Sequence, residues 1–138
     1  MIVDASVAFK WLVTEDGSSE AIALLAEDNI QAPSWLVMEV GNALWKRIAR
    51  GEMNDPEGAI EQIARLPDMV FLVDGKSLAS DALRIACELK HPVYDCLYLA
   101  LAENQDDILV TADQRFLAKA RGTRFEPLVR PLAGGATE

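Results

Sequence analysis

Ile-Leu-Val-Thr-Ala-Asp, residues 108–113, is a short apolar run that ends in a carboxylate. Short runs rich in Ile, Leu and Val predict a buried strand. The chain begins in the same way, with Met1–Val3 followed by Asp4, and a third apolar run covers Met69–Val73. A continuous apolar run is typical of a parallel strand that is covered on both faces. These stretches therefore predict a short parallel sheet in which two strands end in acids.

Helical segments alternate with the predicted strands. Pro33 and Pro56 suit the first turns of helices, and Gly51 suits the end of the longest one. Helices are predicted near residues 5–12, 19–27, 34–50, 56–66, 77–89, 94–103 and 114–120, and strands near 2–4, 30–32, 69–73, 108–110 and 124–126, the last as an edge strand. This alternation predicts an α/β fold, a three-layer α/β/α sandwich with a short, mostly parallel sheet of four to five strands.

The length of 138 residues predicts one domain, over residues 1–130, followed by a disordered tail at 131–138. No apolar run approaches the roughly 20 residues that span a bilayer, and the start carries no basic leader, so we expect a cytoplasmic protein without membrane contact. Cys87 and Cys96 are expected as core thiols.

Four acids occupy places where hydration is poor. Asp4 and Asp113 end apolar runs, and Asp95 opens the apolar stretch Cys96–Leu101. Glu39 is expected mid-helix on an apolar face. A buried carboxylate needs a partner. Three of the acids also have an ordinary interpretation, because Asp4, Asp95 and Asp113 could each cap an element.

A shared site is expected because the carboxyl ends of parallel strands meet at one edge of a sheet, at the switch in strand order. Clustered carboxylates raise one another's pKa unless a cation compensates. Mg²⁺ or Mn²⁺ suits an all-oxygen shell and supports phosphodiester hydrolysis. The candidate catalytic residues are Asp4, Glu39, Asp95 and Asp113, with Asp4, Asp95 and Asp113 as metal ligands and Ser6, Asn42 and Thr111 as supporting polar groups.

Other types of site have no support in the sequence. There is no zinc-ligand spacing, no glycine-rich phosphate loop and no Gly-x-Ser-x-Gly motif, so no organic cofactor is expected. His91 is the single histidine, and we interpret it as a surface or packing residue. The three tryptophans are interpreted as core or interface residues rather than base-stacking platforms.

The formal net charge of −9 argues against nucleic-acid binding over the whole surface. Two local basic clusters remain. Residues 114–138 carry a local charge of +3, and Arg115 and Lys119 are predicted there as RNA-phosphate contacts. Lys46, Arg47 and Arg50 form the second cluster, where a phosphate contact and a solvated helix end with favourable charge both remain open.

Together these motifs resemble the PIN-domain ribonucleases. The resemblance rests on Ile2–Ser6, on Glu39 with Asn42–Leu44, on Tyr94-Asp95 and on Thr111–Asp113 with Phe116. Length and element order are similar to those of the VapC-type toxins of toxin–antitoxin pairs. The resemblance implies a Mg²⁺- or Mn²⁺-dependent endoribonuclease whose acid quartet is Asp4, Glu39, Asp95 and Asp113. It also implies a homodimer, an RNA substrate and a small antitoxin as partner.

Other functions stay open beside the toxin. A non-catalytic binding module on the same fold is one, and a nuclease with a housekeeping or DNA substrate is another. A flavodoxin-like phosphoryl-acceptor domain is disfavoured, because Asp4 stands alone and no lysine follows the last predicted strand.

Overall fold

The computed structural model describes residues 1–27 and 29–133. The strands in this part of the chain are β1 (Ile2–Val3), β2 (Gln31–Pro33), β3 (Phe71–Val73), β4 (Leu109–Thr111) and β5 (Val129–Pro131). The α-helices are α1 (Ala5–Leu12), α2 (Ser18–Ala23), α3 (Leu36–Ala49), α4 (Pro56–Arg65), α5 (Ala79–Leu89), α6 (Val93–Gln105) and α7 (Gln114–Ala120). Short 3₁₀ turns cover Leu24–Ala26, Leu66–Asp68, Gly75–Leu78 and Glu126–Leu128.

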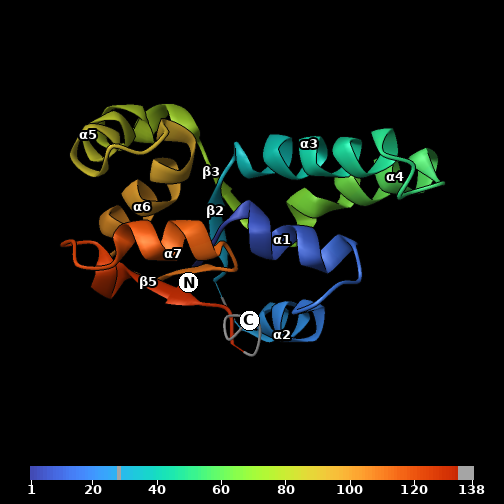
Figure 1. Cartoon of the computed structure of the whole chain (residues 1–138), viewed down its shortest axis with the longest axis horizontal. Helices are drawn as coiled ribbons and strands as arrows, with labels where there is room; N and C mark the ends of the chain where they lie inside the picture. Colours follow the sequence, from blue (N-terminus) through green and yellow to red (C-terminus); the bar gives the residue numbers. More distant parts are fainter. Residues whose placement is uncertain (28, 134–138) are drawn as a thin grey trace.

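Within these residues the strands form one sheet with the order β3-β2-β1-β4-β5, and every pairing is parallel. Helices α1 to α4 lie on one side of the sheet and α5 to α7 on the other (Figure 1). This arrangement follows from right-handed crossovers, because the chain runs outward from β1 to β3 and then returns to build β4 and β5 on the opposite side of β1. The predicted α/β/α sandwich with four to five strands is confirmed.

The core explains the continuous apolar runs. Ile2, Val3 and Leu109 are fully buried, because helices cover both faces of β1 and β4. Helix α6 packs across β1, β2 and β4 with one long buried stripe, while α1 contacts β4 and α3. The order of strands reverses between β1 and β4, so the carboxyl ends of these two strands flank the switch point. Asp4 and Asp113 follow these two strands.

Two predictions at the C-terminal end are corrected. The last strand is Val129–Pro131 and not residues 124–126, because Phe125 is a fully buried core residue and Pro127 lies in the 3₁₀ turn that follows it. The predicted disordered tail began at residue 131, whereas Pro131 belongs to β5 and Leu132 is only 1% exposed. The remainder of that predicted tail, residues 134–138, lies outside the described part of the chain. Among the described residues, no helix combines the length and the apolar character that a bilayer crossing requires.

Candidate active site

Asp4 connects β1 to α1 and lies at the centre of a dense set of hydrogen bonds. Its Oδ1 accepts from the backbone N–H of Ser6 (3.1 Å) and of Val7 (3.3 Å) and from the Ser6 hydroxyl (2.5 Å). The hydroxyl of Thr111, at the end of β4, donates to Oδ2. The cap interpretation is therefore correct for Asp4, and it coexists with a second set of partners across the switch point.

Burial makes the charged form of Asp4 unfavourable. The residue is only 8% exposed. Its pKa is raised to about 6, chiefly because burial removes hydration, and the charge of Asp95 raises it further. The hydrogen bonds from Ser6, Thr111 and Val7 oppose this rise but do not cancel it. Asp4 therefore has enough hydrogen-bond donors but, among the residues that the structure describes, no neighbouring positive charge that offsets its loss of hydration.

Glu39 lies in the first turn of α3, so the prediction of a mid-helix position is wrong. The partner that this half-buried acid needs is Tyr98 of α6, whose hydroxyl donates to Oε1 over 2.6 Å. The pKa of Glu39 is raised to about 7 by burial, and Asp95 and Asp4 raise it further. Burial, and after it the charge of Glu39, holds the pKa of the Tyr98 hydroxyl well above its usual range. The sequence analysis did not identify Tyr98 as a site residue. Its spacing of one helical turn from Asp95 could have indicated it.

Asp95 lies in the first turn of α6 and makes no N-cap; that position belongs to Pro92. Its Oδ2 instead accepts a hydrogen bond from His91 Nε2 over 2.6 Å. The His91 ring also packs against Phe116 of α7, with ring centroids 5.3 Å apart. The prediction of His91 as a surface or packing residue is incomplete, because the ring both packs and orients a candidate catalytic acid. His91 precedes Asp95 by four residues, and this spacing could have indicated the contact between them.

Asp113 is the N-cap of α7, and its Oδ1 accepts from the backbone N–H of Arg115 (3.0 Å) and Phe116 (3.2 Å). Its own backbone N–H donates to Thr111 Oγ1 over 3.0 Å. Thr111 therefore joins the acids at the ends of β1 and β4, because its hydroxyl also donates to Asp4. The predicted supporting role of Thr111 agrees with these contacts.

The structure brings three of the four predicted acids within electrostatic reach of one another. Asp4, Glu39 and Asp95 come from three separate elements. The charge of Asp95 contributes to the raised pKa of both Asp4 and Glu39, and the charge of Asp4 contributes to that of Glu39. Asp113 is connected to Asp4 through Thr111, whose hydroxyl accepts from the Asp113 backbone N–H and donates to Asp4. Over residues 1–27 and 29–133, no three side chains of the His, Cys, Asp or Glu type are placed so that they already enclose a metal ion.

The donor set nevertheless fits a hard divalent cation in its chemistry. The acids offer oxygen ligands, which Mg²⁺ and Mn²⁺ prefer. Asp4 and Glu39 pay a desolvation penalty that a neighbouring positive ion relieves. Binding requires the carboxylates to exchange some of their protein donors for the ion, since Ser6 and Thr111 now occupy both oxygens of Asp4.

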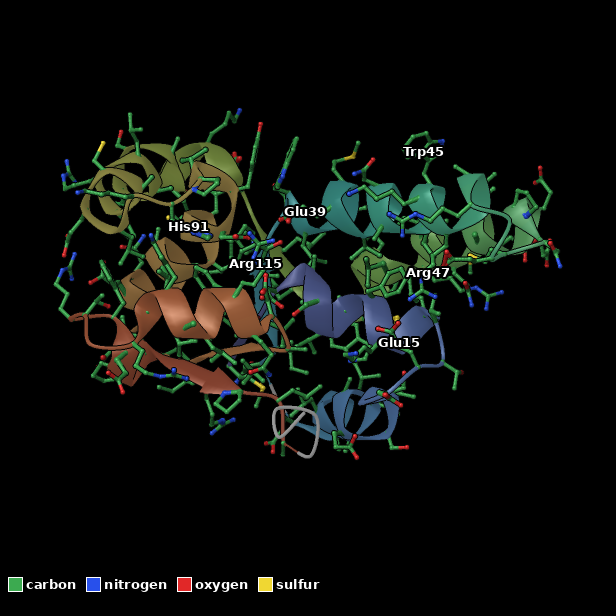
Figure 2. The ribbon with its side chains drawn as sticks, in the orientation of Figure 1. Glu15, Glu39, Trp45, Arg47, His91 and Arg115 are labelled. Carbon is green, nitrogen blue, oxygen red and sulfur yellow. The ribbon has the colours of Figure 1, made fainter. Side chains whose placement is uncertain are left out.

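The other predicted residues surround this cluster. Ser6 also accepts from the backbone N–H of Ala112 over 2.9 Å, which ties α1 to the end of β4. Asn42 is exposed one turn beyond Glu39 and lines a groove between α1 and α3. In Figure 2, Glu39 and Arg115 lie at the starts of α3 and α7, where these helices approach the end of the sheet. Arg115 and Lys119 are both exposed on α7.

Comparison with known proteins identifies the architecture. Residues 1–122 match the PIN domain family. The chain belongs to that family. Ribonuclease VapC3 from Pyrobaculum aerophilum is 28% identical over 134 residues, which cover 95% of this chain and 98% of the relative. Ribonuclease VapC1 from Mycobacterium tuberculosis is 33% identical over 129 residues, which cover 91% and 93%.

A solved structure supports the same arrangement in space. The crystal structure of PAE2754 from Pyrobaculum aerophilum superposes with a TM-score of 0.69 at 27% identity, and the match covers 88% of this chain and 80% of that one. The family resemblance that the acid motifs predicted is therefore confirmed. The first relatives are matched over almost their full length, so this PIN domain makes up nearly the whole of each of them.

Proposed function

We propose that this chain is a divalent-metal-dependent endoribonuclease and the toxin of a toxin–antitoxin pair. The observation that carries the proposal is a set of three acids, Asp4, Glu39 and Asp95, contributed by three elements at the switch point of the sheet. Burial removes hydration from two of them, Asp4 and Glu39, and the charge of Asp95 acts on both. Its relatives VapC3 and VapC1 are named ribonucleases and match over nearly their whole length. Because the acids at this edge of the sheet repel one another, a cation would bind there favourably, and a bound cation would in turn attract a phosphate.

In this proposal Asp4, Asp95 and Asp113 hold Mg²⁺ or Mn²⁺, directly or through water. The chemistry that such an ion supplies is polarisation of a phosphoryl oxygen and a lower pKa for an attacking water. Glu39 orients that water through Oε2, because Oε1 is already held by the Tyr98 hydroxyl. A pKa of about 7 suits Glu39 to accepting a proton near neutral pH. His91 keeps Asp95 in one orientation from outside the cluster.

The substrate in this proposal is single-stranded or looped RNA, whose backbone is accessible for in-line attack. Arg115 is exposed at the start of α7, beside the Asp113 cap, and Lys119 lies one turn further along. In this proposal both side chains contact phosphates near the acids. A small antitoxin and a second copy of the chain are the proposed protein partners. Exposed large apolar side chains support such contacts, with Met38 at 62% and Trp45 at 60% on α3.

The test is cleavage of a labelled, structured RNA by the purified chain with Mg²⁺, with Mn²⁺ and with EDTA. We expect cleavage only with a divalent ion, and none by Asp4→Asn or Glu39→Gln. The matched control is Asp68→Asn, which removes one negative charge at an exposed site in a 3₁₀ turn. Undiminished cleavage by Asp4→Asn contradicts the proposed metal role.

The same assay separates the alternatives. Binding of RNA without cleavage under every metal condition would favour a non-catalytic module. Cleavage of a DNA of matched sequence at the same rate would favour a nuclease with another substrate. Co-expression with the product of the adjacent reading frame tests the antitoxin, since the partner should suppress cleavage. Light scattering of the purified chain tests the dimer.

A further inference from the structure

A groove of about 500 Å³ runs between α1 and α3 and opens onto the acid cluster. Ser6 and Glu39 line its inner end, and Lys10, Lys46, Arg47 and Arg50 line the rest. The change from an acidic inner end to a basic outer part follows from the spacing of the lining residues along α3. Five residues follow Glu39 at spacings of 3, 4, 7, 8 and 11 residues, which places them on the same face of α3 and its C-cap: Asn42, Ala43, Lys46, Arg47 and Arg50.

The basic end of this face extends away from the acids along the helix axis. Glu39 and Arg50 are separated by about 16 Å at 1.5 Å per residue. Positive charge near the end of α3 also interacts favourably with the helix dipole. Lys10, in the last turn of α1 on the opposite wall, contributes a further cation to the same groove. Two helices thus supply positive charge to one channel in a chain whose formal net charge is −9.

A carboxylate bridges the two walls of this groove. Glu15 Oε1 accepts from Arg47 Nη2 over 2.6 Å, and Glu15 Oε2 accepts from Lys10 Nζ over 2.9 Å. Figure 2 shows Arg47 reaching from α3 toward Glu15, while Trp45 points away on the other side of the helix. One anion with two oxygens therefore sits between two cations. A phosphodiester has the same charge and also two anionic oxygens, so it fits the same pair of donors.

Lys46 and Arg50 are available for a different anion. Both are exposed, and neither forms an ion pair with any other residue that the structure describes. We propose that this groove holds the RNA phosphate backbone as it leads to the acid cluster, with Lys46 and Arg50 as contacts and Glu15 as an internal competitor for Lys10 and Arg47. The inference rests on the proposed ribonuclease function and adds the path of its substrate. RNA binding then displaces Glu15 from the two cations that it bridges.

The test measures binding of a fluorescently labelled single-stranded RNA by anisotropy over a range of KCl concentrations, in EDTA so that no hydrolysis occurs. Each phosphate contact with a single strand contributes about 0.7 to the slope of log K against log salt. We expect the double variant Lys46→Ala/Arg50→Ala to bind more weakly, with a slope reduced by about 1.4. The matched control, Arg65→Ala/Arg84→Ala, removes two exposed cations outside the groove and should keep the wild-type slope.

A second pair of variants tests the competitor. Glu15→Gln removes the bridging charge, so it should tighten RNA binding and steepen the salt dependence. Glu61→Gln makes the same charge change on the exposed surface of α4 and should have a much smaller effect. Equal slopes for the groove variant and its cation control would overturn the proposal, as would equal effects of the two Glu→Gln variants.

Failure of the path and failure of the function are distinguishable. A chain that cleaves RNA while its groove variants bind like the controls keeps the ribonuclease proposal and loses the groove. A chain that binds RNA through the groove but never cleaves it retains this binding site and loses the proposed activity.

Discussion

Asp4→Asn should stabilise the metal-free protein at neutral pH, although it removes a native carboxylate. The substitution keeps the N-cap, because the asparagine Oδ1 still accepts from the backbone N–H of Ser6 and Val7. It removes a charge that is only 8% exposed and lies near other acids. The Thr111 hydroxyl donates to Oδ2 in the wild type, and the asparagine NH₂ group at that place cannot accept this hydrogen bond, so the bond is lost.

The magnitude follows from the pKa of Asp4, which rises from an ordinary value of 3.8 to about 6. Each pKa unit corresponds to about 1.4 kcal/mol, so the charged form is disfavoured by about 3 kcal/mol above pH 6. Because the folded-state pKa is the higher one, the folded state binds more protons between pH 4 and 6. The free energy of unfolding of the wild type therefore falls as pH rises through this window. The raised pKa of Glu39, at about 7, extends the fall toward neutrality.

Loss of the Thr111 hydrogen bond costs roughly 1 kcal/mol, so Asp4→Asn should gain about 2 kcal/mol at pH 7.5. For a chain of this size that gain raises the Tm by about 5–10 °C. The assay is thermal unfolding in EDTA at pH 7.5 and at pH 4, with Asp68→Asn as the control for a surface charge. The gain should disappear at pH 4, where wild-type Asp4 is protonated. A variant that is no more stable than the wild type at pH 7.5 would refute the desolvation argument.

Further predictions concern the remaining contacts. Tyr98→Phe removes the hydrogen bond to Glu39, so it should lower the free energy of unfolding by about 1–3 kcal/mol in urea and reduce kcat more than it raises KM. Removal of divalent ions by EDTA should lower the wild-type Tm at pH 7.5, because the carboxylates then repel one another; an unchanged midpoint would argue against ion binding at the cluster. Arg115→Ala and Lys119→Ala should each reduce the salt slope of RNA binding by about 0.7, and an unaltered slope would exclude the residue concerned from the interface. Leu132→Ala should destabilise the fold by about 2–4 kcal/mol in chemical denaturation, whereas a disordered tail would tolerate it.

The sheet could be predicted because its strands are buried on both faces. Continuous apolar runs such as Met1–Val3 and Ile108–Val110 then carry the signal without any need for alternation. Strand β5 was not predicted because it is an edge strand. Val129 is half-buried and Arg130 and Pro131 are exposed, so the segment lacks the continuous apolar run of a buried strand. The nearby Phe125 gave a stronger apolar signal but fills the core from a turn.

The acids could be predicted because each interrupts an apolar context, which is a local property of the sequence. Thr111 was predicted as a supporting polar group, but which side chain each acid contacts could not be predicted in the same way. Tyr98 meets Glu39 from a position 59 residues away, and Thr111 meets Asp4 across 107 residues. Only the three-dimensional arrangement of β1, β4, α3 and α6 brings these pairs together. The bridge from Arg47 to Glu15 over the groove is likewise a tertiary contact.

The capping role of Asp4 does not by itself account for an acid at this position. An N-cap contributes roughly 1 kcal/mol, and Ser or Asn caps a helix about as well as Asp. The charged form at this site costs about 3 kcal/mol above pH 6, so a neutral cap would give the more stable metal-free protein. We therefore expect the carboxylate to act in a state with a compensating positive charge nearby, which the proposed metal ion would supply. Glu39 supports the same conclusion independently, because it caps nothing and is nevertheless held by Tyr98 beside two other acids.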